Sequence, residues 1–175
     1  MKKIILILVT VLAVSVQMMA ADVSYTPLGN GLELITKADR SETFYGLRKD
    51  GIVLLPPEYC VLKHEATQTL TFYRVHYERY YVMVFKAWLE IESYDLTNAK
   101  LIVKKEVKFK NTISDPRKAY EYIPVTFEPC KALKGIAYAL CYDDRTGGGK
   151  NNIIIFGRVD GKLCKYVTSL IPQQL

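Results

Sequence analysis

Polar and aromatic side chains alternate in the segment TFYRVHYERYY, residues 71–81, and this spacing could form a binding surface. In an extended chain every second side chain points to the same face. One face would then carry four residues: Arg74, His76, Glu78 and Tyr80. Tyrosine offers a broad apolar ring with a polar tip, which together with arginine suits the binding of a protein or a glycan. The alternative is an ordinary exposed strand face with cross-strand ion pairs.

A glycine-rich segment, TGGGKN at 146–151, invites comparison with a phosphate-binding loop. That motif needs a glycine five residues before the Gly-Lys pair and a serine or threonine directly after the lysine. Asp144 and Asn151 occupy those two positions here. The segment is therefore expected to be a loop that joins two strands, and no cofactor is predicted.

The two histidines of the chain limit the metal and hydrolase chemistry that it could perform. His64-Glu65 begins like the helix of a zinc protease, but Gln68 stands where the second histidine is needed. Since His76 is the only other histidine, metal sites rich in imidazole are excluded by count. The sequence favours a protein that is not an enzyme. A small secreted hydrolase is the alternative, and it requires a cleft in which His64 or His76 lies within hydrogen-bond reach of an acid or a nucleophile.

The N-terminus, residues 1–20, is expected to be a secretory signal peptide. Lys2 and Lys3 precede an apolar run at 4–16, which is shorter than the about 20 residues that a membrane-spanning helix needs. An uncleaved anchor is the alternative. The prediction is an extracytoplasmic protein, periplasmic or secreted, with no transmembrane segment after cleavage.

Disulfides are expected among the cysteines, because an even number in an exported chain favours them. They could pair in three ways, and none belongs to a C-x-x-C motif: Cys60, Cys130, Cys141 and Cys164. The alternative is four buried free thiols, since free cysteine packs as a small hydrophobe.

The charge balance argues against a nucleic-acid partner. The formal net charge is +6, and residues 1–20 contribute two of the lysines and no acid. The densest basic stretch, at 100–110, alternates lysine with apolar residues as the solvated face of a strand would. The remaining residues, 21–175, are enough for a single domain that buries about two-thirds of its unfolded surface.

Alternating apolar and polar residues predict a mainly β fold, a single antiparallel domain of hairpins and meander. Asp50-Gly51 is expected to form a tight hairpin turn, and Pro56-Pro57 is expected to end the strand that follows it. The region 68–95 favours strand, although a helical stripe leaves 78–93 open between strand and helix. The expected strands, besides 68–95, are 31–37, 42–49, 52–55, 59–63, 135–143, 152–159 and 162–170, with a hairpin at 94–107 that turns at Thr97-Asn98.

One short helix is expected near 116–122. Asp115 can cap its first amides, and Pro116 fits its first position because no N–H is needed there. Pro124 is expected to stop the helix after about two turns.

A resemblance to a known repeat supports a β-rich scaffold. The segment YGLRKDG at 45–51, followed by Pro56-Pro57-Glu58-Tyr59, resembles a WG-type β repeat, in which an aromatic-glycine pair opens a strand and a proline and tyrosine close the unit. FGRVDG at 156–161 is similar to a shorter second copy that lacks the proline-tyrosine close. The resemblance implies a scaffold for binding, and it supplies no catalytic residues.

The sequence thus predicts an exported, non-enzymatic β-rich protein that binds a protein or an envelope glycan. The alternative is a carbohydrate-binding accessory domain, for which an exposed Trp88 or a platform of tyrosines would be needed.

Overall fold

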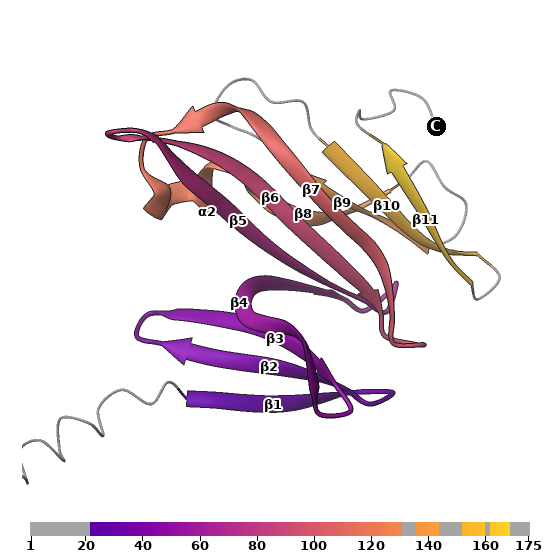
Figure 1. Ribbon diagram of the computed structural model, residues 1–175. Coiled ribbons are helices and arrows are strands. Elements are labelled where there is room, and N and C mark those ends of the chain that lie inside the picture. The colour runs from indigo at the N-terminus through magenta and orange to yellow at the C-terminus, as the bar shows by residue number, and fades with distance from the viewer. Residues whose placement is uncertain (1–21, 131–135, 144–151, 160–161, 169–175) are drawn as a thin grey trace, which may run out of the picture.

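The computed structural model describes residues 22–130, 136–143, 152–159 and 162–168. These residues form two antiparallel sheets and one short helical segment (Figure 1). The larger sheet has the strand order β1-β2-β3-β4-β5-β6-β7, and the smaller has the order β11-β10-β9-β8. The strands are β1 (Asp22–Gly29), β2 (Leu32–Asp39), β3 (Glu42–Lys49), β4 (Ile52–His64), β5 (Thr69–Tyr81), β6 (Val84–Asp95), β7 (Lys100–Ile113), β8 (Val125–Pro129), β9 (Ile136–Tyr142), β10 (Asn152–Val159) and β11 (Lys162–Thr168).

The predicted fold class, mainly β and antiparallel with one short helix, is confirmed. The region 78–93, open between strand and helix, is strand on both sides of a turn at Val82 and Met83. Asp50 and Gly51 form the predicted hairpin turn with φ of 50° and 82°. The sequence did not predict β1 and β8. Most side chains of β1 are exposed, so it lacks the alternation that marks a half-buried strand.

The prediction that Pro56-Pro57 ends a strand is wrong, because β4 continues through both prolines to His64. Leu47 pairs with Leu55 and Tyr45 with Tyr59, so three residues of β4 lie opposite Gly46 alone. This bulge takes the prolines out of the hydrogen-bonded ladder, where their missing N–H groups would cost stability. A Cβ atom on Gly46 would lie 2.5 Å from the carbonyl oxygen of Leu55, which explains the glycine.

Beyond the bulge, β4 changes partners. Its first part pairs with β3, and Cys60–His64 pairs with the start of β5. As Figure 1 shows, β4 curls at this point, so that β1–β3 fold against β5–β7. An apolar cluster fills the space between these two layers: Leu32, Leu47, Leu55, Tyr59, Leu70, Phe72, Tyr94 and Leu96.

The opposite face of β5–β7 packs on the smaller sheet and on the helical segment. This second cluster includes the odd-numbered residues of β5 and β6 whose alternation predicted strands, among them Val75, Ala87, Leu89 and Ile91. From the other side it receives Leu140, Ile154 and Phe156. The strands β5 and β6 therefore form the middle of three layers.

The predicted helix is confirmed. It begins as a 3-10 turn, Pro116–Lys118, and continues as α2, Ala119–Tyr122. The Asp115 carboxylate accepts a hydrogen bond from the N–H of Arg117 at 3.1 Å, as a capping residue should. Within the described residues, no helix is long and apolar enough to cross a membrane.

One buried ion pair joins the two sheets. Arg158 of β10 donates to the carboxylate of Asp95 at 3.0 Å and to the carbonyl of Thr67 at 3.1 Å. Asp95 also accepts hydrogen bonds from Thr97 and Asn98, so its carboxylate organises the turn from β6 to β7.

Candidate functional site

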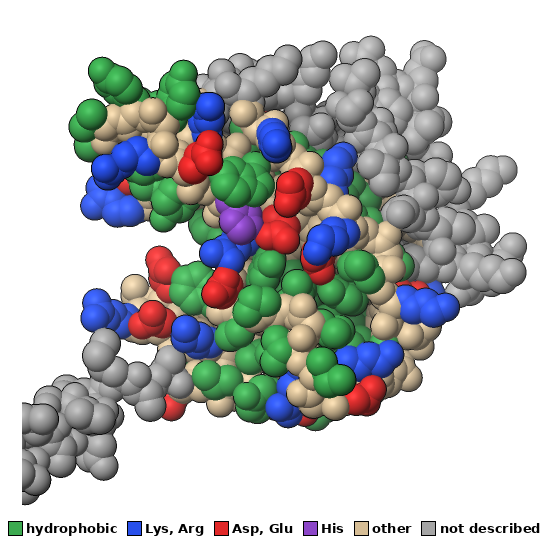
Figure 2. Space-filling model, in the orientation of Figure 1, with side chains coloured by type: hydrophobic (Ala, Val, Ile, Leu, Met, Phe, Trp, Pro, Cys, Tyr) green, Lys and Arg blue, Asp and Glu red, His purple; other side chains and the backbone are tan. Residues whose placement is uncertain are grey.

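A cleft of about 520 Å³ opens where β4 leaves β3 and the first two layers diverge. Figure 2 shows this opening between the lower and upper parts of the molecule. The β1–β4 layer lines one wall with Lys37, Glu42, Phe44, Pro57 and Glu58. The other wall consists of β5, at Arg74–Tyr77, and the helical segment, at Pro116, Arg117 and Tyr120.

Among the described residues, the strand edge in the second wall has no partner strand. Since β4 pairs with β5 only as far as Tyr73, residues 74–81 are paired on the β6 side alone within the part of the chain that the structure describes. The N–H of Val75 points to the open edge, where it donates to the hydroxyl of Tyr120 at 3.3 Å. Because backbone groups alternate sides along a strand, Tyr77 and Arg79 direct their N–H and C=O groups to the same edge.

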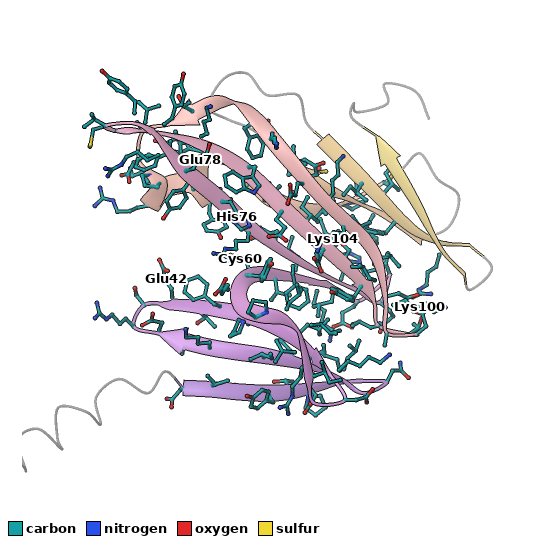
Figure 3. The ribbon with its side chains drawn as sticks, in the orientation of Figure 1. Glu42, Cys60, His76, Glu78, Lys100 and Lys104 are labelled. Carbon is teal, nitrogen blue, oxygen red and sulfur yellow. The ribbon has the colours of Figure 1, made fainter. Side chains whose placement is uncertain are left out.

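The structure places the four predicted surface residues on one strand, β5, and brings two of them into the cleft. Arg74 forms an ion pair with Glu58 of the opposite wall, and His76 lines the cleft beside it. Glu78 and Tyr80 lie further along β5, towards its turn. Figure 3 shows His76 and Glu78 on β5, with Glu42 on the opposite layer and Cys60 at the closed end of the opening.

His76 is held by two residues of β6. Its Nε2 lies 2.6 Å from a carboxylate oxygen of Glu90. Its ring stacks on the ring of half-buried Trp88, with 5.0 Å between the ring centroids and an interplanar angle of 6°. The same Glu90 oxygen accepts a hydrogen bond from the hydroxyl of Tyr59 at 3.3 Å. Burial, followed by the nearby carboxylates, raises the pKa of Tyr59 to about 12, so this hydroxyl remains protonated and can donate.

Sequence reasoning did not identify Glu90 as part of this surface. The turn at Val82 and Met83 fixes the register of β5 and β6, which puts Trp88 opposite His76 and Glu90 opposite Arg74. Placing that turn correctly in the sequence would have predicted that Glu90 lies opposite Arg74 and beside His76.

His76 and Glu90 meet the condition stated for the hydrolase alternative, a histidine within hydrogen-bond reach of an acid at a cleft. The described lining residues include no serine, threonine or cysteine that could act as the nucleophile. Cys60 lies near the cleft, but its hydrogen-bond partners are the hydroxyls of Tyr73 and Tyr120, and burial raises the pKa of its thiol. A raised pKa lowers the fraction of reactive thiolate, so this environment does not activate Cys60.

His64 lies away from the cleft, between the larger and the smaller sheet. Its ring packs on the rings of Tyr138 and Phe127, with centroid distances of 3.6 Å and 5.0 Å. Burial lowers the pKa of His64. These contacts make His64 a packing residue of this junction.

Three of the four cysteines have described side chains, and all three are free thiols: Cys60, Cys130 and Cys141. The side chain of Cys164, the segments 1–20 and 146–151, and the last two residues of the shorter WG-like copy, 160–161, lie outside the described residues. The disulfides and the signal peptide therefore stay predictions. No cluster of three or more potential metal ligands occurs among the described residues.

The chain was compared with protein-family models, curated proteins and solved structures, and none of them matches it.

Proposed function

We propose that this protein is an exported, non-enzymatic binding protein whose cleft takes an extended polypeptide segment as an additional strand on β5. The observation that carries the proposal is the edge of β5 in the wall of the cleft, which has no partner strand in the described part of the chain. Strand addition satisfies backbone groups on both chains, and the side chains of the added strand provide specificity.

The side chains around this edge support such a ligand. Phe44, Tyr77 and Tyr120 present aromatic surface from both walls. The charges of Arg74 and Arg117 are paired with Glu58 and Asp115, so neither wall carries a concentrated charge of one sign. A segment with alternating aromatic or aliphatic residues suits this lining better than a highly charged one.

The location of Trp88 provides a direct assay. It is the only tryptophan of the chain, and it stacks on a residue that lines the cleft. Peptides selected from a random phage-displayed library are titrated while the intrinsic fluorescence is followed. Binding in the cleft should change the Trp88 emission in a saturable way.

A proline substitution separates backbone recognition from side-chain recognition. Tyr77→Pro removes an N–H from the open edge of β5, and Tyr77→Ala is the matched control that keeps it. Proline is tolerated at a strand edge. We expect the peptide Kd of Tyr77→Pro to exceed that of Tyr77→Ala at least about tenfold, because the ladder loses a hydrogen bond and its neighbours are displaced. Equal affinities of the two variants, with circular dichroism showing both folded, would refute strand addition.

A glycan is the second candidate ligand, favoured by the exposure of Tyr77 and Tyr80, which are 50% and 62% exposed. Sugar rings stack on exposed aromatic side chains, whereas one face of Trp88 is already covered by His76. Retention of envelope polysaccharide by the immobilised protein, without any peptide binding, would favour this ligand over the first.

A further inference from the structure

The turn between β5 and β6 carries a run of exposed apolar side chains that the cleft does not use. Tyr80 is 62% exposed, Tyr81 72%, Val82 69% and Met83 69%. Four consecutive exposed residues of this kind are unfavourable in water unless they serve a contact. Figure 1 shows that this turn projects as one end of the middle layer, away from the smaller sheet.

Folding does not require these residue types at the turn. Tight hairpin turns favour glycine, asparagine and aspartate, and the turns at Asn30-Gly31 and Asp50-Gly51 follow this rule with positive φ. Val82 and Met83 have no positive φ and no side-chain oxygen or amide to stabilise a turn. A polar pair would connect the strands at least as well and would keep the tip soluble. The tip therefore has the chemistry of a contact surface.

We propose that this tip is a membrane-contact site, which inserts Tyr81, Val82 and Met83 into the headgroup region of a bilayer that contains anionic lipid. Tyrosine is enriched at the boundary between lipid headgroups and acyl chains, where its ring and hydroxyl meet apolar and polar surroundings. The aliphatic side chains of Val82 and Met83 add the apolar area that drives insertion.

Charges near the tip match an anionic surface. Arg79 and Lys86 flank the apolar residues, and the ammonium group of Lys86 lies 4.3 Å from the centre of the Tyr80 ring. Glu78, which pairs with Lys86 across the strands, is the single acid between residues 78 and 86. Figure 2 shows blue Lys and Arg side chains beside the green tip at the upper left. Each cation near the surface of an anionic membrane adds to the attraction.

The small size of the tip favours a bilayer over a protein partner. A stable protein interface uses roughly 20 to 30 residues a side around a buried centre. The tip offers four adjacent residues on a convex projection, which is enough to enter a fluid interface but too little to form the centre of such a contact. This inference is independent of the peptide proposed for the cleft.

Vesicle sedimentation tests the site. All variants are expressed from the full sequence in the same host and purified in the same way, and mass spectrometry verifies that they have the same N-terminus. The vesicles consist of phosphatidylcholine alone or of equal parts phosphatidylcholine and phosphatidylglycerol. We expect V82S/M83S to bind the anionic vesicles at least about tenfold more weakly than the original chain. The variant lacks two apolar side chains that the original chain would bury in the bilayer.

The control is a second exposed apolar pair, Ile52 and Val53, which are 69% and 57% exposed at the start of β4. In Figure 1 the turn from β3 to β4 lies at the lower edge of the molecule, far from the tip at the upper left. I52S/V53S should bind vesicles within about twofold of the original chain, although it loses a similar apolar area.

A fluorescent reporter places the contact at the tip. In a Trp88→Phe background, Val82→Trp should shift its emission to shorter wavelength on anionic vesicles, whereas Ile52→Trp should not. The proposal is overturned by equal vesicle binding of the two serine variants, or by a tryptophan at position 82 whose emission stays that of water. Peptide binding in the cleft should be unchanged in V82S/M83S. The peptide assay and the vesicle assay therefore test the cleft proposal and the membrane proposal independently.

Discussion

At the cleft, Arg74 and His76 are each held by a carboxylate from a neighbouring strand. Glu58 of β4 pairs with Arg74, and Glu90 of β6 contacts His76. Long polar side chains lose rotamer freedom when they bind a ligand, which costs free energy. Here the fold has already fixed these side chains, so a ligand would meet a surface whose polar groups are largely ordered.

His64 gives a prediction about pH at the scale of one residue. Burial lowers its pKa below the ordinary value of 6.5, so the unfolded chain takes up this proton at a higher pH than the folded protein does. The free energy of unfolding should therefore fall as the pH drops below about 6.5, and His64 should contribute nothing to the pH dependence well above it. Urea midpoints at about pH 7.5 and about pH 5.5 measure this effect.

The variant His64→Phe keeps a ring against Tyr138 and Phe127 but cannot titrate. Its urea midpoint should fall less between the two pH values than that of the original chain. His76 is present in both proteins, so it cancels in the comparison. An equal fall in the two proteins would contradict the assignment.

At the scale of elements, Gly46 and the Pro56-Pro57 bulge depend on each other. A Cβ atom at position 46 would meet backbone atoms of Leu55, Pro56 and Pro57 at 2.5 to 2.8 Å, and backbone cannot move aside as a flexible side chain can. We expect Gly46→Ala to lower the free energy of unfolding by about 2 kcal/mol, as overpacking does in a folded interior. Urea unfolding measures the difference.

Gly51→Ala is the control for this substitution. Nothing lies within 4 Å of a Cβ atom there, and only the φ of 82° opposes a side chain. Its cost should be about 1 kcal/mol. A Gly46→Ala variant that is less affected than Gly51→Ala would show that the bulge adjusts without strain.

Elements that carry a local signal could be predicted from the sequence, and contacts that depend on register could not. The turn at Asp50-Gly51 and the helix capped by Asp115 are determined by residues within a few positions, and both were predicted. The continuation of β4 through two prolines depends on a glycine in another strand, so local rules predicted an end. The alternation of side chains along β5 was enough to predict that Arg74 and His76 share a face. The position of Glu90 beside them depends on the register of β5 with β6, which the sequence did not reveal.

At the scale of the whole molecule, Asp95 and Arg158 connect the two sheets. Their side chains are only 5% and 17% exposed. Removing one member leaves a charge in surroundings where water cannot easily replace its partner. We expect Arg158→Met to lower the free energy of unfolding by about 3 kcal/mol, and Asp95→Asn in the same chain to restore part of the loss. Urea unfolding of the single and double variants measures both effects.

Arg117→Met provides the comparison for that pair. Arg117 contacts Asp115 at 3.0 Å, but its side chain is 88% exposed, so solvent screens the interaction. The free energy of unfolding of Arg117→Met should equal that of the original chain. If Arg117→Met and Arg158→Met lowered the free energy of unfolding by similar amounts, burial would not determine the strength of the Asp95–Arg158 ion pair.

The strand order of the larger sheet has a consequence for how the protein assembles. Each strand from β2 to β7 pairs with the strand just before it in the chain, so neighbours in space are neighbours in sequence. Loops between such strands close at a low entropic cost, and proteins with many local contacts fold faster than sheets with distant pairings. As the chain emerges from its N-terminus, every new strand of this sheet finds its partner in the segment made immediately before it.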